Sequence, residues 1–144
     1  MSTFKWLPYN TADTPTWAPT LTSGNMTNTA WSLSSEIDNS SGLYTLADLV
    51  INMSASVTPS ASGYVAVYLL PNIDGNYALS SAGVVGTNYW ATNIVSGGQA
   101  QTYFQCRGIL MTPNKFKLLI QNNLGVAFAA TATASLYRYG EQAV

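Results

Sequence analysis

The clearest pattern in the chain is an alternation of apolar and small polar positions between residues 46 and 57. The apolar positions are Leu49, Ile51, Met53, Ala55 and Val57, and the polar positions between them include Asn52, Ser54 and Ser56. Successive side chains of a β-strand point to opposite faces of the sheet, so a period of two is typical of a strand with one buried face. Residues 46–57 are therefore predicted to form such a strand.

Further strands are predicted at short intervals along the chain. Their ranges are 30–34, 64–70, 101–111, 115–121 and 126–139. Residues 64–70 are continuously apolar, which is typical of a strand that is buried on both faces. Residues 115–121 alternate instead, and we expect Phe116, Leu118 and Ile120 to face the core.

Turn signals separate these strands. Residues 58–63 form a cluster of Thr, Pro, Ser, Ala and Gly, and the pair Asp74-Gly75 predicts a tight turn because glycine tolerates a positive φ. Asn122-Asn123 predicts the turn after residue 121. Residues 78–102 are rich in Ser, Gly and Asn and are predicted to be loop-like, with Val84-Val85 and Tyr89-Trp90 as candidate short strands or anchors.

The fold class follows from these elements and from the absence of a helical pattern. The alanine-rich run 127–134 has helical propensity, but Thr131 and Thr133 alternate with alanine there, and β-branched residues at every second position suit a sheet better. Several short strands with many turns and no helix predict an all-β protein, built as an antiparallel β-sandwich of jelly-roll-like form.

The first 24 residues differ from the rest. Three prolines interrupt this segment, which shows neither a two-residue nor a helical period. It nevertheless carries large apolar and aromatic side chains, which an exposed tail rarely keeps in water. These residues are Phe4, Trp6, Leu7, Tyr9 and Trp17. We therefore predict an extended N-terminal arm over residues 1–24 that docks on its own domain or on a neighbour, followed by a β-sandwich domain over residues 25–144.

The composition excludes several classes of function. Only 8% of the residues are charged, histidine is absent, and Cys106 is the one cysteine. A structural zinc site, a disulfide framework and histidine-based catalysis therefore lack their residues. Five basic against six acidic residues disfavour a basic face for nucleic acid. We expect no signal peptide, no membrane span, no metal and no cofactor.

Two groups of residues are candidates for chemistry. Glu36 and Asp38 are two positions apart, but their surroundings are a turn-like polar segment, so a solvated loop is the favoured interpretation over an acid–base or calcium site. Arg107 beside Cys106 favours a thiolate, but no histidine can act as its base, so a buried structural thiol is preferred. These observations predict a protein that is not an enzyme.

The aromatic residues leave a second class of function open. Tryptophan and tyrosine make up much of the 12% aromatic content, and exposed rings on a β-sandwich can stack on sugars. The same enrichment is typical of protein–protein contacts. The sequence does not say which rings are exposed, so both interpretations stand.

Three stretches carry a resemblance to a known group of proteins. They are Gly63–Tyr77 (GYVAVYLLPNIDGNY), Pro113–Ala127 (PNKFKLLIQNNLGVA) and Tyr139–Val144 (YGEQAV). These stretches resemble segments of small virion structural proteins of tailed bacteriophages, over roughly residues 40–144. The resemblance rests on strand-and-turn patterns and implies a β-sandwich that decorates or cements a capsid, or that belongs to the tail or fibre apparatus.

The leading hypothesis is therefore a non-enzymatic phage virion structural protein, made in the host cytoplasm and located in the virion. As a capsid decoration or cement protein, it would bind the major capsid protein or other virion proteins as well as its own copies, forming a homo-oligomer without contacting nucleic acid or membrane. The predicted interface residues are Phe4, Trp6, Leu7, Tyr9 and Trp17. The alternative is a tail- or fibre-associated module that binds a receptor or carbohydrate.

Overall fold

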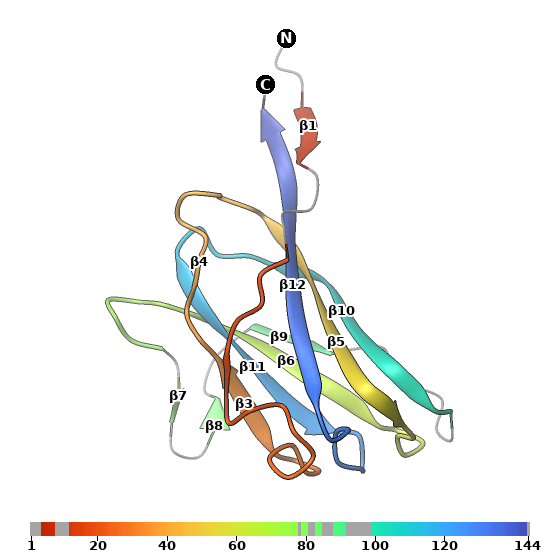
Figure 1. Ribbon diagram of the computed structural model, residues 1–144. Helices are drawn as coiled ribbons and strands as arrows, with labels where there is room; N and C mark the ends of the chain where they lie inside the picture. The colour runs from red at the N-terminus through yellow and green to blue at the C-terminus, as the bar shows by residue number, and fades with distance from the viewer. Residues whose placement is uncertain are drawn as a thin grey trace.

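Twelve strands and no helix make up the part of the chain that the structure describes (Figure 1). The computed structural model describes residues 4–7, 12–77, 79–80, 83–84, 88–91 and 99–143. The strands are β1 (Phe4–Leu7), β2 (Trp17–Ala18), β3 (Trp31–Ser34), β4 (Ile37–Asp38), β5 (Leu46–Val57), β6 (Tyr64–Pro71), β7 (Leu79–Ser80), β8 (Gly83–Val84), β9 (Asn88–Ala91), β10 (Gln101–Leu110), β11 (Lys115–Asn123) and β12 (Ala132–Ala143). Within these ranges no helix could cross a membrane.

The strands form two main antiparallel sheets. One has the order β1-β12-β5-β10, and the other has the order β2-β3-β11-β6-β9 with β4 beside β11; β7 and β8 pair separately. Without the four two-residue strands, eight remain, and they pair first with last, second with seventh, third with sixth and fourth with fifth. These pairs are β1–β12, β3–β11, β5–β10 and β6–β9. This nested pairing is the jelly-roll arrangement, so the predicted fold class is confirmed.

The core lies between the two sheets and is filled by alternate residues of each strand. Leu49, Ile51 and Met53 of β5 are buried there, whereas Ala55, which lies beyond the pairing with β12, is exposed. The inward direction predicted for residues 116, 118 and 120 of β11 is confirmed, since all three side chains have no exposed surface. The bounds of β5 coincide with the predicted strand 46–57.

Strand β6 is buried on both faces, as its continuous apolar sequence predicts. Val65, Val67 and Leu69 belong to the core between the sheets. Ala66 and Leu70, at the alternate positions, are only 1% and 0% exposed. A strand in the middle of a sheet can bury both faces only if its polar backbone groups are paired, and β6 pairs with β11 on one side and β9 on the other.

The turn predicted at Asp74-Gly75 is confirmed. Asp74 and Gly75 have φ values of 52° and 81°, the two consecutive positive angles of a type I′ turn. The flanking residues Ile73 and Asn76 exchange two backbone hydrogen bonds of 2.9 Å each. Asp74 tolerates this conformation better than most residues other than glycine, which is why the pair is a strong signal in the sequence.

Two predictions about the last third of the chain are wrong. Asn122 and Asn123 do not form a turn: they end β11, opposite Val65 and Tyr64 of β6. The Asn122 side chain is buried and bonds to backbone on both sides, donating from Nδ2 to the Met26 and Val126 carbonyl oxygens at 2.8 Å and accepting from Leu124 N–H at 2.9 Å. It acts as a bridge between loops, which a local pattern cannot reveal.

The second correction concerns the predicted strand 126–139. Strand β12 begins only at Ala132, and residues 126–131 form an irregular connection. Phe128 and Ala129 of this connection are buried in the core, and Phe128 N–H donates to the carbonyl oxygen of Met26 at 3.1 Å. These apolar residues are buried by the irregular connection itself, so their pattern in the sequence resembles a strand although the strand begins only at Ala132.

Candidate functional site

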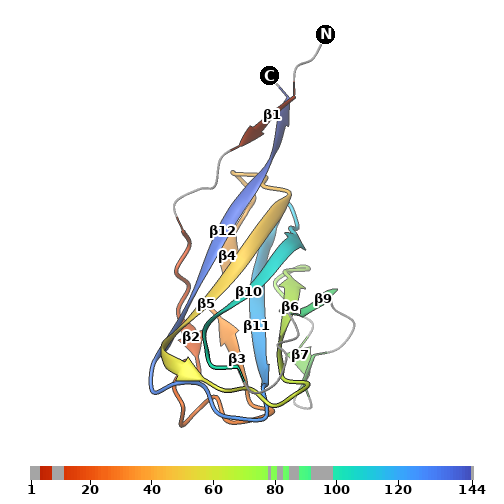
Figure 2. The ribbon, with the colours of Figure 1, turned by 90° about the vertical axis from the view of Figure 1, so that its right-hand side faces the viewer.

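A two-stranded ribbon projects from one end of the sandwich (Figures 1 and 2). The first part of β12, Ala132 to Tyr139, pairs with β5, and its last part pairs with β1, with Gly140 opposite Leu7 and Ala143 opposite Phe4. We call β1 together with residues 140–143 the ribbon. Among the strands that the structure describes, β1 is an edge strand with β12 on one side and no strand on the other.

Gly140 marks the point where the ribbon leaves the sandwich. It is buried, and a Cβ atom placed on it would lie 2.8 Å from Oγ1 and 3.1 Å from the backbone nitrogen of Thr45, the residue just before β5. Both separations are shorter than an ordinary contact. A glycine is therefore required here by the close approach of the chain at residue 45.

The five predicted interface residues are divided among different places. Phe4, Trp6 and Leu7 lie on β1 of the ribbon. Tyr9 lies outside the described residues. Trp17 lies on β2, is half-buried and packs against the core, so it belongs to the sandwich and not to the ribbon. The interface role of these residues stays a prediction.

The segment between the ribbon and β2 is held on the sandwich by an ion pair. Arg138 Nε and Nη2 donate to the two carboxylate oxygens of Asp13 at 2.6 and 3.2 Å. Asp13 also exchanges two backbone hydrogen bonds of 2.9 Å with Leu136 of β12. Farther along, Leu21 is part of the core. Residues from about 13 onward in the predicted arm thus pack on the chain's own sandwich.

A second candidate site lies on the outer face of the four-stranded sheet. A hollow of about 240 Å³ is lined there by Asp48, Val50, Gln105, Arg107 and Tyr137. All five alternate with core residues of β5, β10 and β12, so they point away from the core. The strand pairing places them side by side, since Val50 lies opposite Gln105 and Asp48 lies opposite Tyr137. We call this site the sheet hollow.

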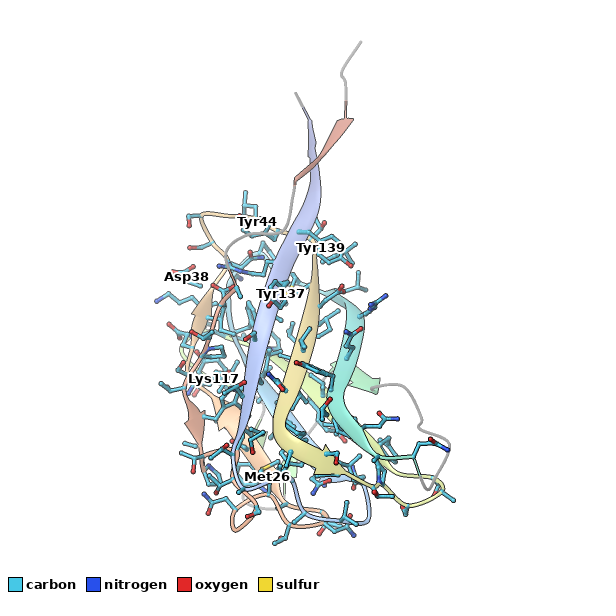
Figure 3. All side chains as sticks on the ribbon, turned by 45° about the vertical axis from the view of Figure 1, so that its right-hand side comes forward. Met26, Asp38, Tyr44, Lys117, Tyr137 and Tyr139 are labelled. Atoms are coloured by element: carbon cyan, nitrogen blue, oxygen red, sulfur yellow. The ribbon has the colours of Figure 1, made fainter. Side chains whose placement is uncertain are left out.

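Hydrogen bonds hold the polar side chains of the sheet hollow in place. Arg107 Nε and Nη2 both donate to Gln105 Oε1, at 3.0 and 2.7 Å. Asp48 Oδ1 accepts from Gly108 N–H at 2.9 Å and from the Tyr139 hydroxyl at 3.2 Å. Gly108 has φ 66° and lies in the irregularity where β10 shifts its register against β5, which brings its N–H to Asp48. Figure 3 looks onto this sheet and labels Tyr137 and Tyr139 on β12.

No local pattern in the sequence singles out the residues of the sheet hollow. Its residues occupy outward positions of three predicted strands, and they could be recognised as one site only if these strands were known to be neighbours in the sheet. That recognition needs the order of the strands, because β5, β10 and β12 are far apart in the chain and become neighbours only through pairing.

Glu36 and Asp38 are both held as carboxylates by separate partners. Glu36 accepts hydrogen bonds from the Tyr77 hydroxyl and from Asn72, and forms an ion pair with Lys115 at 3.0 Å; the Tyr77 bond is the largest cause that lowers the Glu36 pKa, followed by Lys115. Two bonds from Ser40, of 2.6 and 2.8 Å, lower the pKa of Asp38. An acid–base pair needs one carboxyl with a raised pKa, and neither has one.

No metal centre is formed by the residues that the structure describes, among which no three Cys, Asp or Glu side chains come together. Cys106 is buried in the core, and burial, followed by the charge of Asp48, raises the pKa of its thiol to about 12. Arg107 does not activate it, because consecutive strand residues point to opposite faces and the guanidinium bonds to Gln105 on the outer face. The preferred interpretation of Cys106 as a buried thiol is confirmed.

Comparisons with known proteins add only distant likenesses. No family model and no curated protein matches the chain. Among solved structures, one titled desmodium yellow mottle tymovirus has a TM-score of 0.44 and 10% identity, covering 99% of this chain and 88% of its own. A carbohydrate-binding module described as recognising mannan, TmCBM27, has a TM-score of 0.40 and 10% identity, covering 95% and 88%.

A third structure, the K1 cleaved adhesin domain of Lys-gingipain from Porphyromonas gingivalis, has a TM-score of 0.38 and 11% identity and covers 99% of both chains. Likenesses at this level carry no argument about function. The jelly-roll fold rests on the strand pairing described above, and this fold serves many unrelated functions. The ribbon and the sheet hollow are therefore the features of this chain that bear on its function.

Proposed function

We propose that this protein is a virion structural protein without enzymatic activity. In this proposal it is a decoration or cement protein of a tailed-phage capsid, the group that its sequence resembles. It is located in the virion, where it binds the major capsid protein or another virion protein together with further copies of itself. The observation that carries the proposal is the projecting ribbon, in which β1 has a strand on one side only among the strands that the structure describes.

The ribbon favours the binding of a partner because a two-stranded ribbon that packs on nothing else has low stability. An isolated two-stranded ribbon is marginally stable in water, and an edge strand offers unpaired N–H and C=O groups to an incoming strand. The sequence of β1 adds apolar content to this edge, since Phe4, Trp6 and Leu7 are three of its four residues. A neighbouring subunit that adds a strand to this edge would satisfy the backbone groups of β1 and gain contact with an apolar sequence.

Attachment through the ribbon would stabilise a shell by mass action. A protein that binds only the assembled state shifts the assembly equilibrium toward that state, and each tenfold excess over Kd adds about 1.4 kcal/mol per site. The contacts repeat over a lattice, and copies that also bind one another raise the effective concentration of each next copy. The low charge of the chain, 8% of residues, keeps repulsion between adjacent copies small.

The test locates the protein in particles. Virus particles from the organism that carries the gene are banded by density and probed with an antibody raised against the purified chain. The proposal expects the chain in the particle band at a constant ratio to the major capsid protein. Recovery of the chain only in the soluble fractions, with complete particles in the band, would overturn it.

A pair of matched variants assigns attachment to the ribbon. Trp6→Ser changes a tryptophan of β1, and Trp31→Ser changes one on β3 that is 43% exposed on the other sheet. After both variants are shown to fold by circular dichroism, each is added to particles that lack the protein. We expect Trp6→Ser to coat them poorly and Trp31→Ser to coat them as the unchanged chain does. Equal coating by the two variants would contradict attachment through the ribbon.

The alternative function, a tail- or fibre-associated module that binds a receptor or carbohydrate, has one observation of its own in its favour. This is the sheet hollow, with an aromatic ring and hydrogen-bonding side chains held on a rigid sheet. It lies on a different surface from the ribbon, and the two properties are compatible in one protein.

A further inference from the structure

We infer that the sheet hollow is a binding site for a neutral oligosaccharide. This inference deepens the alternative function named above, because it assigns a site and a ligand class to that carbohydrate binding. It does not depend on the structural role, because the ribbon and the sheet hollow share no residue. It is supported by the chemistry of the five lining residues that the structure describes, by the hydrogen bonds that hold the polar ones and by their charge.

The lining residues match the two kinds of surface that a sugar ring offers. A pyranose has apolar C–H groups on its faces and hydroxyl groups around its rim. Val50 and the Tyr137 ring supply apolar and aromatic surface for the C–H face. Gln105, Arg107 and Asp48 supply donors and acceptors for the rim, since a guanidinium has five N–H donors and a carboxylate accepts several hydrogen bonds. Ligand sites typically combine apolar lining with a few placed polar groups in this way.

The polar groups are held in position before a ligand arrives. Two hydrogen bonds to Gln105 Oε1 fix the plane of the Arg107 guanidinium and leave other N–H groups of the same side chain for a ligand. Asp48 is fixed by the Gly108 N–H and the Tyr139 hydroxyl. Groups that are already ordered lose little entropy on binding, which matters for a weakly bound class of ligand such as sugars.

The charge of the sheet hollow favours a neutral ligand. Among the lining residues that the structure describes, Arg107 and Asp48 contribute one charge of each sign. A phosphate or other strong anion would meet the Asp48 carboxylate, and a metal ion would meet the Arg107 guanidinium. Neither ion finds a single-sign environment, whereas hydroxyl groups can both donate to a carboxylate and accept from a guanidinium.

The site extends along β10 beyond one sugar unit. Tyr103 is two residues before Gln105 and points to the same outer face, about 7 Å away along the strand. Its side chain is 56% exposed, which is high for an aromatic residue in a strand. It lies opposite Asn52 of β5, so a second ring and a second amide stand beside the sheet hollow. This arrangement fits at least two consecutive sugar units.

The test screens the full-length chain against defined glycans. The neutral set contains linear hexasaccharides of mannose, glucose, xylose and galactose, and the charged set contains sialylated and uronic-acid oligosaccharides. The best neutral glycan is then titrated by calorimetry. We expect binding of at least one neutral glycan with a Kd between about 1 μM and 1 mM. Absence of binding by every neutral glycan at about 5 mM, or binding of charged glycans alone, would overturn the inference.

Variants assign the binding to the sheet hollow. Tyr137→Ala should lower the affinity about tenfold or more, and Tyr137→Phe, which keeps the ring, should stay within about threefold. Arg107→Ala is a second variant at an exposed position that does not contribute to the core, and it should lower the affinity about fivefold or more. Trp31→Ala, on the other sheet, is the matched control and should leave it unchanged. Unchanged affinity in both Tyr137→Ala and Arg107→Ala would refute the assignment.

The outcome is separable from that of the proposed function. Trp6→Ser should bind the glycan as the unchanged chain does but should coat particles poorly. Tyr137→Ala should coat particles as the unchanged chain does but should bind the glycan weakly. A chain that binds glycan but is missing from particles would reject the capsid role alone. A chain present on particles that binds no neutral glycan would reject the sheet hollow alone.

Discussion

Replacing Arg138 with methionine should destabilise the sandwich by about 2–3 kcal/mol. Besides its ion pair with Asp13, the guanidinium donates from Nη1 to the Asp38 carbonyl oxygen at 2.8 Å and to Asn39 Oδ1 at 3.3 Å. It also lies 5.1 Å from the centre of the Tyr44 ring. One side chain thus ties the N-terminal segment and the loop after β4 to β12, and methionine keeps much of its apolar stem without the charge.

The magnitude follows from the burial of the ion pair. The side chains of Arg138 and Asp13 are 12% and 27% exposed, so the pair is neither a surface bridge nor fully buried. Exposed pairs contribute about 0–1 kcal/mol, and removing one partner of a buried pair costs about 3–5 kcal/mol. The expected loss lies between these limits. For a chain of this size it corresponds to a fall in Tm of about 5–10 °C.

Urea unfolding followed by tryptophan fluorescence measures the loss, and a double-mutant cycle separates the ion pair from the other contacts. The cycle uses Asp13→Asn, Arg138→Met and the double variant. We expect a coupling free energy of about 1–2 kcal/mol and an unchanged m-value. A coupling below about 0.3 kcal/mol would refute the reasoning, because independent sites give values of that size. Hydrogen exchange at the Asp13 and Leu136 amides should be faster in Arg138→Met. The two backbone hydrogen bonds between these residues open more often once Arg138 no longer holds the Asp13 carboxylate.

Three further predictions follow from the same contacts. Gly140→Ala should cost about 1–3 kcal/mol through the clash with residue 45, measured by urea unfolding, and no loss would contradict the close approach. The thiol of Cys106 has a pKa raised to about 12, so it should resist a thiol reagent at pH 8 until the chain unfolds; the stability that its neutral form contributes should fall as pH rises from about 9, where the unfolded thiol ionises. The pKa of Glu36 is lowered by Tyr77 and then Lys115, so its contribution is present above the unfolded value of 4.5 and is lost as pH falls through the lower folded value; Glu36→Gln should flatten that part of an acid-unfolding curve.

The strands of the sandwich could be predicted because their information is local. The bounds of β5 and the two-sided burial of β6 follow from the order of apolar and polar residues within each segment. The turn at Asp74-Gly75 follows from the backbone freedom of two adjacent residues. Each of these features needs only neighbours in the chain.

The remaining features depend on residues that are distant in the chain. The pairing of Phe4 with Ala143 joins the two ends of the sequence, and no local pattern encodes it. Asn122 looks like a turn residue, but its amide is saturated by carbonyl groups of two loops that only the fold brings together. The sheet hollow was missed for the same reason, because its residues belong to three strands whose order is set by the jelly-roll winding.

Strand β12 carries both candidate functions, and the spacing along it predicts that they act independently. Tyr137 lies opposite Asp48 within the paired sheet, whereas Trp6 lies opposite Glu141 in the ribbon. Glu141 is four positions after Tyr137, which is about 14 Å along an extended strand and exceeds the distance at which substitutions usually couple. The variant carrying Trp6→Ser and Tyr137→Ala should therefore show the sum of the two single losses, with glycan affinity equal to that of Tyr137→Ala alone. A further change in glycan affinity on adding Trp6→Ser would show that the ribbon and the sheet hollow are coupled through β12, and the two sites would then have to be treated as one.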